Sequence, residues 1–433
     1  MASAEPKPTR VLIVTHGCRL NTADTALLTA RLRRAGCEIV AEDETAFRSP
    51  ALVVVNSCAV TAEAERKSRQ TVRKLRRRFP AARIAVLGCA SAASAESAEA
   101  LRRAGADLVA GNPGKRDLDA LLREGAAKSA FPLRTGRGTG TERSFREGVA
   151  AEFPRRTRAF IKIQEGCDNF CTYCLVPLLR GPERSRDFDE TLAECRQAAA
   201  AGFPELVLTG VNSCAYRTPD GRGLAELIRA VAALPGEFRI RLGSTEPGRL
   251  SGSAGLLDAI AEEPRMCRFL HLSLQHGSNA VLRRMNRRYT AEEFAAFVDE
   301  ARRRVPGIHI GSDFIVGFPG ESDAEFEEGL EFVRRCAFAN LHIFPFSPRP
   351  GTAAAVMPGR PGADVVRRRL AALHAAAEGS KQAFALSQRG CELPVIFESV
   401  DADGTARGWS DNYLEVTAPA DAVPLGRIVF WRF

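Results

Sequence analysis

The sequence predicts an α/β protein with three parts: an N-terminal open parallel-sheet domain, a central partial (β/α)6 barrel and a small C-terminal β-barrel. Two observations predict this fold class. Apolar runs alternate twice with amphipathic helical patterns, on either side of a polar segment, and the end of the chain changes to short strands with polar turns. We therefore divide the 433 residues into a first domain (8–130), a linker (131–157), a barrel domain (158–382) and a β module (383–433).

The first domain contains four apolar runs that indicate buried strands: Val11–Val14, Ala51–Asn56, Arg83–Gly88 and Asp107–Gly111. Helical patterns separate these runs, which predicts βαβ units and a parallel sheet. The segment that follows is rich in Gly, Arg, Thr and Ser and has no sustained apolar period, as is typical of a linker.

The barrel domain contains six longer strand–helix units, and right-handed crossovers between parallel strands favour an open barrel. Its six strands are expected at residues 159–166, 205–212, 238–247, 269–277, 309–320 and 340–348. The last segment has three strand patterns, at 391–400, 406–418 and 426–433, which favour a small β-barrel.

Composition limits the class of protein. No apolar stretch near the start is long enough for a signal peptide, and no segment approaches a membrane span, so we expect a cytoplasmic protein with no membrane partner. Twelve cysteines in a reducing compartment favour metal binding or redox catalysis over a disulfide framework.

Three cysteines lie directly after the first barrel strand. Cys167, Cys171 and Cys174 have C-x3-C-x2-C spacing, and three thiolates from one loop can ligate three irons of a 4Fe-4S cube. The fourth iron then stays open and can accept the amino and carboxylate groups of S-adenosylmethionine (SAM). A structural zinc loop is the alternative, but zinc usually takes four ligands from two C-x2-C pairs, and no second pair exists here. The spacing therefore favours the cluster.

The loop EGCDNFCTYCLVP resembles the signature of the radical SAM superfamily. The resemblance implies that Tyr173 packs near the adenine of the cofactor. It also implies cofactor-binding positions at the ends of later strands, although a glycine there is more often required by a turn. These positions are Gly210, Asn212, Glu246, Gln275, Asp313 and Gly317.

Three further cysteines, Cys18, Cys58 and Cys89, each follow a predicted parallel strand of the first domain. Strand ends of an open α/β sheet meet in one crevice, so these distant thiols can converge. Most free cysteines are small buried hydrophobes, but three in equivalent positions favour a second cluster. We interpret the cysteines at 37, 195, 267, 336 and 391 as structural, and Cys214 has no assigned role.

With these two trios and a short C-terminal module, the chain resembles the methylthiotransferase family over nearly its entire length. The segments NSCAVTAEAERKSRQ, CDNFCTYCLVP with RGPERSR, HLSLQHGSNAVLRRMNRRYT and DFIVGFPGES carry the match. The resemblance implies two 4Fe-4S clusters and SAM as cofactors, the cluster of the first domain being auxiliary and involved in sulfur delivery. The segment GCASAA lacks the aromatic and the glutamine that commonly follow this cysteine, which bears on local packing rather than ligation.

Methylthiolation of an unactivated C–H position requires a radical route. Our hypothesis is that one SAM methylates a sulfur held at the auxiliary cluster, and that a second SAM is cleaved at the central cluster so that its radical enables transfer of the methylthio group. A reductant such as flavodoxin or ferredoxin and a sulfur donor are then required as partners.

Basic residues favour transfer RNA as the substrate. The net charge is +9, and in the family the C-terminal barrel resembles the RNA-binding TRAM module. Trp409, Tyr413 and Trp431 of this module can stack on bases or form its core. Two basic runs suit phosphate contacts, although such runs are usually solvated faces: residues 66, 67, 69, 73, 74 and 76–78, and Arg283, Arg284, Arg287 and Arg288.

Within the family, NSCAVTAEAERKSRQ and CDNFCTYC resemble the branch that modifies N6-threonylcarbamoyladenosine beside the anticodon to its 2-methylthio derivative. Rival branches act on N6-isopentenyladenosine or on an aspartate of a ribosomal protein. A rival from another class is a non-catalytic iron-sulfur RNA-binding sensor.

Overall fold

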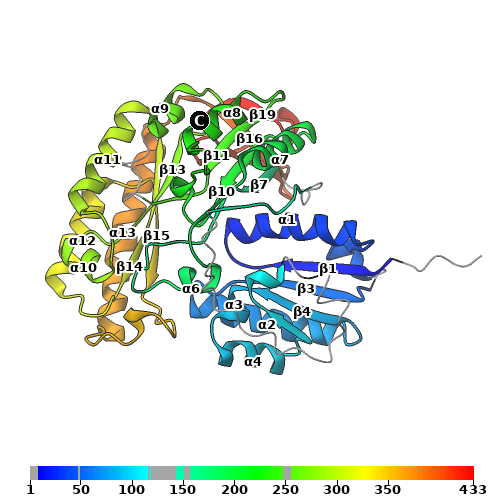
Figure 1. Ribbon diagram of the computed structural model, residues 1–433. Helices are drawn as coiled ribbons and strands as arrows, with labels where there is room; N and C mark the ends of the chain where they lie inside the picture. The colour runs from blue at the N-terminus through cyan, green and yellow to red at the C-terminus, as the bar shows by residue number, and fades with distance from the viewer. Residues whose placement is uncertain (1–7, 47–48, 116–117, 119–142, 151–156, 247–254) are drawn as a thin grey trace, which may run out of the picture.

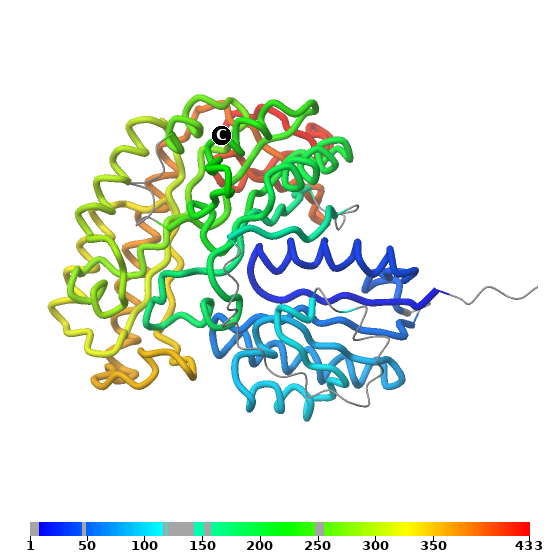
Figure 2. Tube along the Cα trace, viewed as in Figure 1, coloured from blue at the N-terminus to red at the C-terminus, as the bar shows by residue number. Residues whose placement is uncertain are grey.

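The computed structural model describes residues 8–46, 49–115, 118, 143–150, 157–246 and 255–433. Figure 1 shows a smaller N-terminal body, coloured blue to cyan, beside a larger body that contains the barrel and the C-terminal strands. Helix α1 (Arg19–Arg34) packs against the barrel strands β7 and β10, and it follows the boundary between the two bodies in Figure 2. Of the expected linker, only 143–150 and 157 are among the described residues.

The first domain is a five-stranded parallel sheet in the order β2-β1-β3-β4-β5. Helix α1 covers one face of the sheet, and α2, α3 and α4 cover the other, which explains why the strands are apolar throughout. The four predicted strands are confirmed, whereas β2 was missed because three residues are too few to show a period. The elements are β1 (Arg10–Thr15), β2 (Glu38–Val40), β3 (Leu52–Ser57), β4 (Arg83–Gly88), β5 (Leu108–Ala110), α2 (Ala62–Arg78), α3 (Cys89–Ala92) and α4 (Ala95–Arg103).

Helix α2 shows how local sequence sets these elements. The Thr61 side chain caps its start by accepting a hydrogen bond from the Ala64 amide at 3.2 Å. Val72 and Leu75 face the sheet, and three consecutive arginines ending at Arg78 lie in the last turn, where cations favour the helix dipole.

The barrel is a row of parallel strands in chain order, from β7 to β15. Gly243 interrupts one strand, so that β11 pairs with β10 and β12 pairs with β13. Among the described residues β7 and β15 are edges of the row, which confirms the open barrel. The strands are β7 (Arg158–Lys162), β10 (Glu205–Thr209), β11 (Arg239–Leu242), β12 (Ser244–Thr245), β13 (Phe269–Gln275), β14 (His309–Val316) and β15 (Asn340–Pro345).

Alternation along β13 separates the outside of the barrel from its lumen. Leu270, Leu272 and Leu274 pack in the core formed with the outer helices, so Phe269, His271 and Ser273 face inward. The helices are α7 (Phe188–Ala200), α8 (Leu224–Ala232), α9 (Leu256–Glu262), α10 (Asn279–Arg284), α11 (Ala291–Arg304), α12 (Asp323–Cys336) and α13 (Ala363–Ser387). No helix within the described ranges is long and apolar enough to cross a membrane.

Short elements surround the start of the barrel. Helix α6 (Val176–Arg180) lies between the two bodies. A small sheet of order β6-β9-β8 joins β6 (Ser144–Phe145), β9 (Arg184–Arg186) and β8 (Gln164–Glu165).

The C-terminal strands form one antiparallel sheet in the order β18-β17-β16-β19, where the sequence predicted a small barrel. Arginines of β11 dock it to the barrel: Arg239 donates to the Pro394 carbonyl at 2.8 Å, and Arg241 donates to the Asp411 carbonyl at 2.9 Å. The strands are β16 (Glu392–Val400), β17 (Thr405–Ser410), β18 (Glu415–Pro419) and β19 (Ile428–Arg432).

The aromatics of this module are packed. Trp431 lies edge-on to Phe397 in the core, with ring centroids 5.9 Å apart, and Trp409 stacks with Tyr413 at 4.9 Å. Tyr413 in turn contacts Phe269 of the barrel. Trp431 is therefore part of the core of the module, whereas Trp409 and Tyr413 lie where the module meets the barrel. Phe430 is 68% exposed.

Candidate active site

The cysteines of the first domain converge at the carboxyl edge of its sheet. Cys58 follows β3 directly, Cys89 follows β4 directly, and Cys18 caps α1 just beyond β1. Burial, together with the nearby thiols of Cys18 and Cys89, raises the pKa of Cys58 to about 11. The three strand-end thiols thus interact electrostatically, as the sequence pattern predicted.

A glycine in a left-handed conformation leaves space for the Cys58 side chain of this trio. Gly17 adopts φ +99°, and a Cβ atom there would lie only 2.7 Å from the Cys58 sulfur. The Asn112 side-chain amide donates to the Cys89 sulfur at 3.5 Å and to the Leu179 carbonyl of α6 at 3.1 Å. Asn112 therefore connects the trio to the loop of the central cysteines.

The central trio lies in the loop after β7 and β8. The Val176 amide donates to the Cys174 sulfur at 3.4 Å, and Arg287 Nη1 donates to the Cys171 sulfur at 3.2 Å. Burial and the neighbouring thiols raise the pKa of Cys167 to about 11 and that of Cys174 to about 12. Thiols in this state lose their protons when a cation binds them, so the donor set fits a metal cluster.

Sulfur spacing distinguishes a cluster from a single zinc ion. Zinc with thiolates at about 2.3 Å holds its sulfurs roughly 3.8 Å apart. In neither trio do the three sulfurs all lie within 4.8 Å of one another. Neither trio is therefore arranged around a single ion.

The central loop is fixed by the segment after α10. The Asn286 side chain donates to the Asn169 and Phe170 carbonyls, both at 3.1 Å, and the Thr172 hydroxyl donates to the Arg284 carbonyl at 2.9 Å. These bonds hold the backbone on either side of Cys171, so the loop is positioned by a segment more than a hundred residues away in sequence.

Gly166 is required at the start of this loop. Its φ is +73°, and a Cβ atom there would lie 1.9 Å from the Pro182 carbonyl oxygen. Gly202, with φ +81°, has no atom within 4 Å of the equivalent Cβ position and is a matched control. We expect Gly202→Ala to cost about 1–3 kcal/mol from the positive φ alone, and Gly166→Ala to cost clearly more because the backbone must also move. Thermal unfolding of both variants measures the difference; equal losses would contradict it.

Arg287 belongs to this site, not to a phosphate-binding surface as the sequence suggested. Its side chain is 4% exposed and pairs with Glu246 at 3.0 Å. It also donates to the Ser273 carbonyl at 2.8 Å and to the Tyr289 hydroxyl at 3.0 Å. Arg284 also pairs with a carboxylate: its two terminal nitrogens, Nη1 and Nη2, each donate to Glu325 at 2.8 Å. Sequence alone missed both roles, because a run of arginines looks the same whether it is buried or solvated.

The basic residues of helix α2 are likewise of two kinds, some paired with carboxylates and some exposed. Arg66 pairs with Glu63, and Arg76 pairs with Asp107. The side chains that remain exposed, without a described carboxylate partner, are Lys67, Arg73, Lys74 and Arg77.

The predicted cofactor-binding residues separate into two groups. Near the central trio lie Tyr173, partly buried against the cluster of Met285 and Phe318, and Glu246, which the Arg287 pair holds in place. The Cys214 sulfur accepts the Glu246 amide, which places this unassigned cysteine beside the site. Asn212 is 2% exposed and neither atom of its side-chain amide has a partner in the described chain, so it is free to bind a ligand.

The other positions have structural explanations. Gly210 lies against Gln164, and a Cβ there would be 2.9 Å from that side chain. Gly317, with φ +75°, forms a turn whose amide donates to Glu321. Gln275 has a left-handed φ of 72° at the end of β13, and Asp313 binds two histidines of the lumen.

Helix α6 links the two trios, a role that the sequence did not suggest. Leu175 and Leu179, just after Cys174, pack in the core of the first domain with Cys89. Arg180 donates to the Asn21 side chain at 2.8 Å and to Asp24 at 3.1 Å, both on α1.

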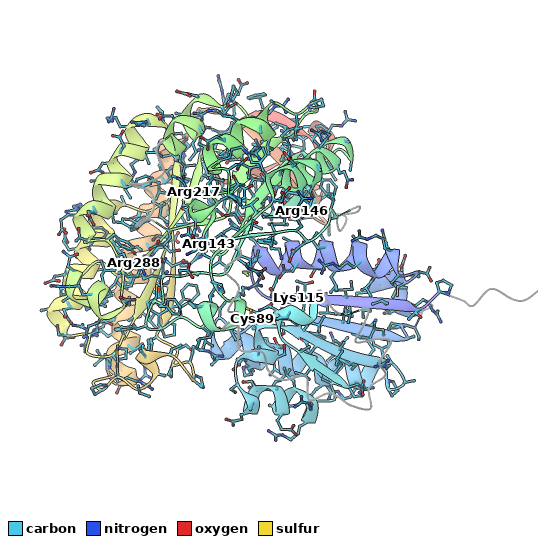
Figure 3. All side chains as sticks on the ribbon, viewed as in Figure 1. Cys89, Lys115, Arg143, Arg146, Arg217 and Arg288 are labelled. Atoms are coloured by element: carbon cyan, nitrogen blue, oxygen red, sulfur yellow. The ribbon has the colours of Figure 1, made fainter. Side chains whose placement is uncertain are left out.

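A buried ionic network continues from this helix. Asp24 accepts from Lys115 and Lys162, each at 2.7 Å, and Arg180 also pairs with Glu165 at 3.2 Å. Figure 3 places Lys115 and Cys89 at the boundary between the two bodies. The network therefore fixes how one trio faces the other.

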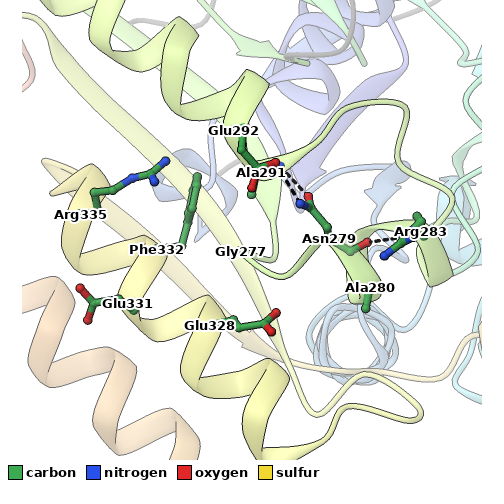
Figure 4. Close-up of a pocket in the computed structure, with 10 residues that line it drawn as sticks. All are labelled: Gly277, Asn279, Ala280, Arg283, Ala291, Glu292, Glu328, Glu331, Phe332 and Arg335. Carbon is green, nitrogen blue, oxygen red and sulfur yellow. Dashed lines mark hydrogen bonds between the residues drawn. The ribbon is translucent and has the colours of Figure 1, made fainter.

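A pocket of about 490 Å³ lies elsewhere, between α10, α11 and α12. In Figure 4, Asn279 accepts a hydrogen bond from Arg283 and donates one to Glu292 at the edge of this pocket. Its lining contains no cysteine and none of the predicted site residues. We assign it no part in the chemistry.

Known protein families match the two bodies of the chain separately. The Radical SAM superfamily matches residues 161–333, and the Uncharacterized protein family UPF0004 matches residues 10–111. The chain is similar to threonylcarbamoyladenosine tRNA methylthiotransferase MtaB of Thermotoga maritima, at 34% identity over 94% of this chain and 90% of the relative. It is also similar to tRNA-2-methylthio-N(6)-dimethylallyladenosine synthase of Maricaulis maris, at 36% identity over 96% and 92%.

Among solved structures, the fold is similar to the radical S-adenosylmethionine methyltransferase TsrM of Kitasatospora setae. The TM-score is 0.57 at 17% identity, covering 81% of this chain and 77% of that one. This likeness extends over both the first domain and the barrel, since neither alone reaches that share of the chain.

Proposed function

This chain belongs to the radical SAM methylthiotransferase family, and from that membership we propose that it methylthiolates N6-threonylcarbamoyladenosine of transfer RNA at C2. The observation that carries the proposal is the pair of cysteine trios joined by α6, with Asn112 bonded to both Cys89 and the helix. The MtaB names of relatives from Thermotoga maritima, Bacillus subtilis and Aquifex aeolicus, at 32–34% identity, support the choice of nucleoside.

Roles for the site residues follow from this proposal. The trio of Cys167, Cys171 and Cys174 binds the central 4Fe-4S cluster, and the trio of the first domain binds the auxiliary one. Reductive cleavage of SAM at the central cluster supplies the radical, and the auxiliary cluster supplies the sulfur. Arg287 donates a hydrogen bond to a ligating sulfur, which stabilises negative charge there, and we assign Asn212, Tyr173 and Glu246 to SAM binding, which the unpartnered side-chain amide of Asn212 supports.

Exposed arginines support an RNA substrate. Figure 3 shows Arg143, Arg146, Arg217 and Arg288 on the barrel body. Arg217 and Arg288 have no carboxylate partner within the described ranges, so they are available for phosphates, although Arg288 also donates to the Asp168 carbonyl at 3.2 Å. The enzyme then acts in the cytoplasm and requires a reductant such as flavodoxin or ferredoxin and a sulfur donor.

Nucleoside mass spectrometry of transfer RNA from a deletion strain tests the proposal. We expect loss of 2-methylthio-N6-threonylcarbamoyladenosine and accumulation of its unmethylthiolated precursor, with restoration by the wild-type gene. Loss of the 2-methylthio-isopentenyl nucleoside instead would assign the chain to the branch of the Maricaulis maris relative. An unchanged nucleoside profile with loss of a methylthiolated ribosomal aspartate would point to the protein-modifying branch. Absence of methionine and 5'-deoxyadenosine release on reduction of the purified protein would leave the non-catalytic sensor.

A further inference from the structure

Three neighbouring strands place a polar cluster on the wall of the lumen. His271 of β13, Asp313 of β14 and His342 of β15 have side-chain ligand atoms that all lie within 4.8 Å of one another. Their strands pair in register, with Asp313 directly opposite His342. None of these side chains belongs to either cysteine trio, so their convergence needs another explanation.

Asp313 uses its two carboxylate oxygens to hold the two imidazoles. Oδ2 lies 3.1 Å from His271 Nε2, and Oδ1 lies 3.4 Å from His342 Nδ1. Burial acts to raise the pKa of Asp313, but the hydrogen bonds from both histidines outweigh it and lower the pKa. The ionised carboxylate therefore fixes the His342 ring through Nδ1 and leaves Nε2 as its unused polar atom.

His342 and Phe344 present an open surface to the lumen. They lie two residues apart on β15 and so share a face, with their rings edge-on at 6.3 Å. Their outward neighbours Leu341 and Ile343 pack with the helical core. The His342 side chain is 51% exposed and Phe344 is 41% exposed, so both rings are accessible to a ligand.

The cluster lies between the two cysteine loops. On the lumen face of β13, Phe269 lies under the Arg19 guanidinium at 5.6 Å, and Arg19 follows Cys18 directly. Four residues further along the strand, the Ser273 carbonyl accepts from Arg287, which also binds Cys171. His271 is midway between them, about 7 Å along the strand from each.

We propose that Phe344 and His342 form the subsite for the target nucleoside, Phe344 stacking on the purine and His342 Nε2 hydrogen-bonding the polar acyl substituent on N6. This rests on the proposed function and deepens it. C2 is a ring carbon of the purine and N6 is attached to a different ring carbon, C6, so a base whose C2 faces the cluster loop directs its N6 group to another part of the lumen. The threonylcarbamoyl group carries a hydroxyl, a carboxylate and a urea, whereas the isopentenyl group has no polar atom.

The subsite explains discrimination between the two nucleosides. A polar substituent can hydrogen-bond His342 Nε2, whereas an apolar substituent in the same place would cover this half-exposed nitrogen without giving it a partner. Stacking on Phe344 is available to either base and contributes affinity without selectivity. Selectivity is therefore assigned to His342, held by Asp313 and His271.

Steady-state kinetics with two anticodon stem-loop RNAs test the proposal, one carrying N6-threonylcarbamoyladenosine and one N6-isopentenyladenosine. We expect His342→Ala to lower kcat/KM for the first RNA by roughly 10- to 100-fold, as for a lost hydrogen bond to a charged group, and to reduce the preference between the RNAs by the same factor. Phe344→Leu should weaken binding of both RNAs alike. His374→Ala, at an exposed histidine of α13, is the matched control and should change neither value.

Failure of the subsite and failure of the proposed function would give different results in this experiment. If the wild type prefers the threonylcarbamoyl RNA and His342→Ala keeps that preference, the subsite is wrong and the proposed function stands. If the wild type does not act on that RNA, the proposed function fails and the subsite with it. The same three side chains also match a two-histidine, one-carboxylate metal site; a bound metal beyond the cluster iron that is lost in His342→Ala would overturn the hydrogen-bonding role.

Discussion

Replacement of Cys58 by alanine should abolish methylthiolation of transfer RNA while the protein still releases 5'-deoxyadenosine from SAM on reduction. Cys58 is buried between the other two thiols of its trio, whereas the central loop takes its contacts from the Arg284–Arg288 segment. Loss of one ligand should therefore remove the auxiliary cluster and leave the central one. Product analysis by mass spectrometry, alongside 5'-deoxyadenosine release, measures both activities in one reaction.

Cys391→Ala is the matched control for this experiment, because Cys391 is exposed and far from either trio in sequence. It should retain both activities. Equal loss of SAM cleavage and methylthiolation in Cys58→Ala, with the fold and the central cluster intact, would contradict a division of labour between the two clusters.

Replacement of Asp24 by alanine should lower the free energy of unfolding by about 3–5 kcal/mol, the cost of removing one partner from a buried ionic network. Asp24 accepts from Lys115, Lys162 and Arg180, which come from both bodies of the protein. Without it, Lys162 retains the carboxylates of Glu147 and Glu165, and Arg180 retains that of Glu165. Calorimetry or urea unfolding at pH 7 measures the loss, and methylthiolation should fall with it because α1 and α6 set how the trios face each other.

The dependence of stability on acid pH gives a second measurement on Asp24→Ala. Burial acts to raise the pKa of Asp24, but the three cations outweigh it and hold the pKa well below its usual range. A lowered native pKa stabilises the protein above the unfolded value of about 3.9 and loses that contribution as pH falls further. The gap between wild type and Asp24→Ala should thus narrow below about pH 4. Glu63→Ala, which breaks an exposed pair with Arg66, should leave the free energy of unfolding almost unchanged at either pH, because solvent screens the pair.

Sequence reasoning identified most of the fold because apolar period and strand length are local properties. Every strand expected in the first domain and barrel is present, and the alternation that predicted them also sets which face of β13 is outward. Sequence reasoning missed β2, because this strand is too short to show a period. It also predicted a small C-terminal barrel where the strands form an open sheet with β18 and β19 at its edges, because closure of a sheet depends on tertiary packing.

The part of the candidate site that could be predicted from the sequence is the part that lies directly after predicted strands. Cys18, Cys58 and Cys89 could be grouped because each follows a parallel strand, and strand ends share an edge. Arg287 could not, because its partners Glu246 and Ser273 are contributed by other strands. The burial of Lys162 and Arg180 was not predicted for the same reason. Each of these charges is buried because it pairs with a carboxylate that is distant in sequence or on another element.

Metal analysis of anaerobically reconstituted protein tests the central claim most directly, namely that two cysteine trios hold two 4Fe-4S clusters and that only the central one binds SAM. Wild type should contain about eight irons, and alanine replacement of either whole trio should leave about four. Addition of SAM should change the EPR spectrum of the reduced protein only when Cys167, Cys171 and Cys174 are present. Tetrahedral zinc without iron-sulfur absorbance at the central loop, or a SAM response that survives its removal, would contradict the account.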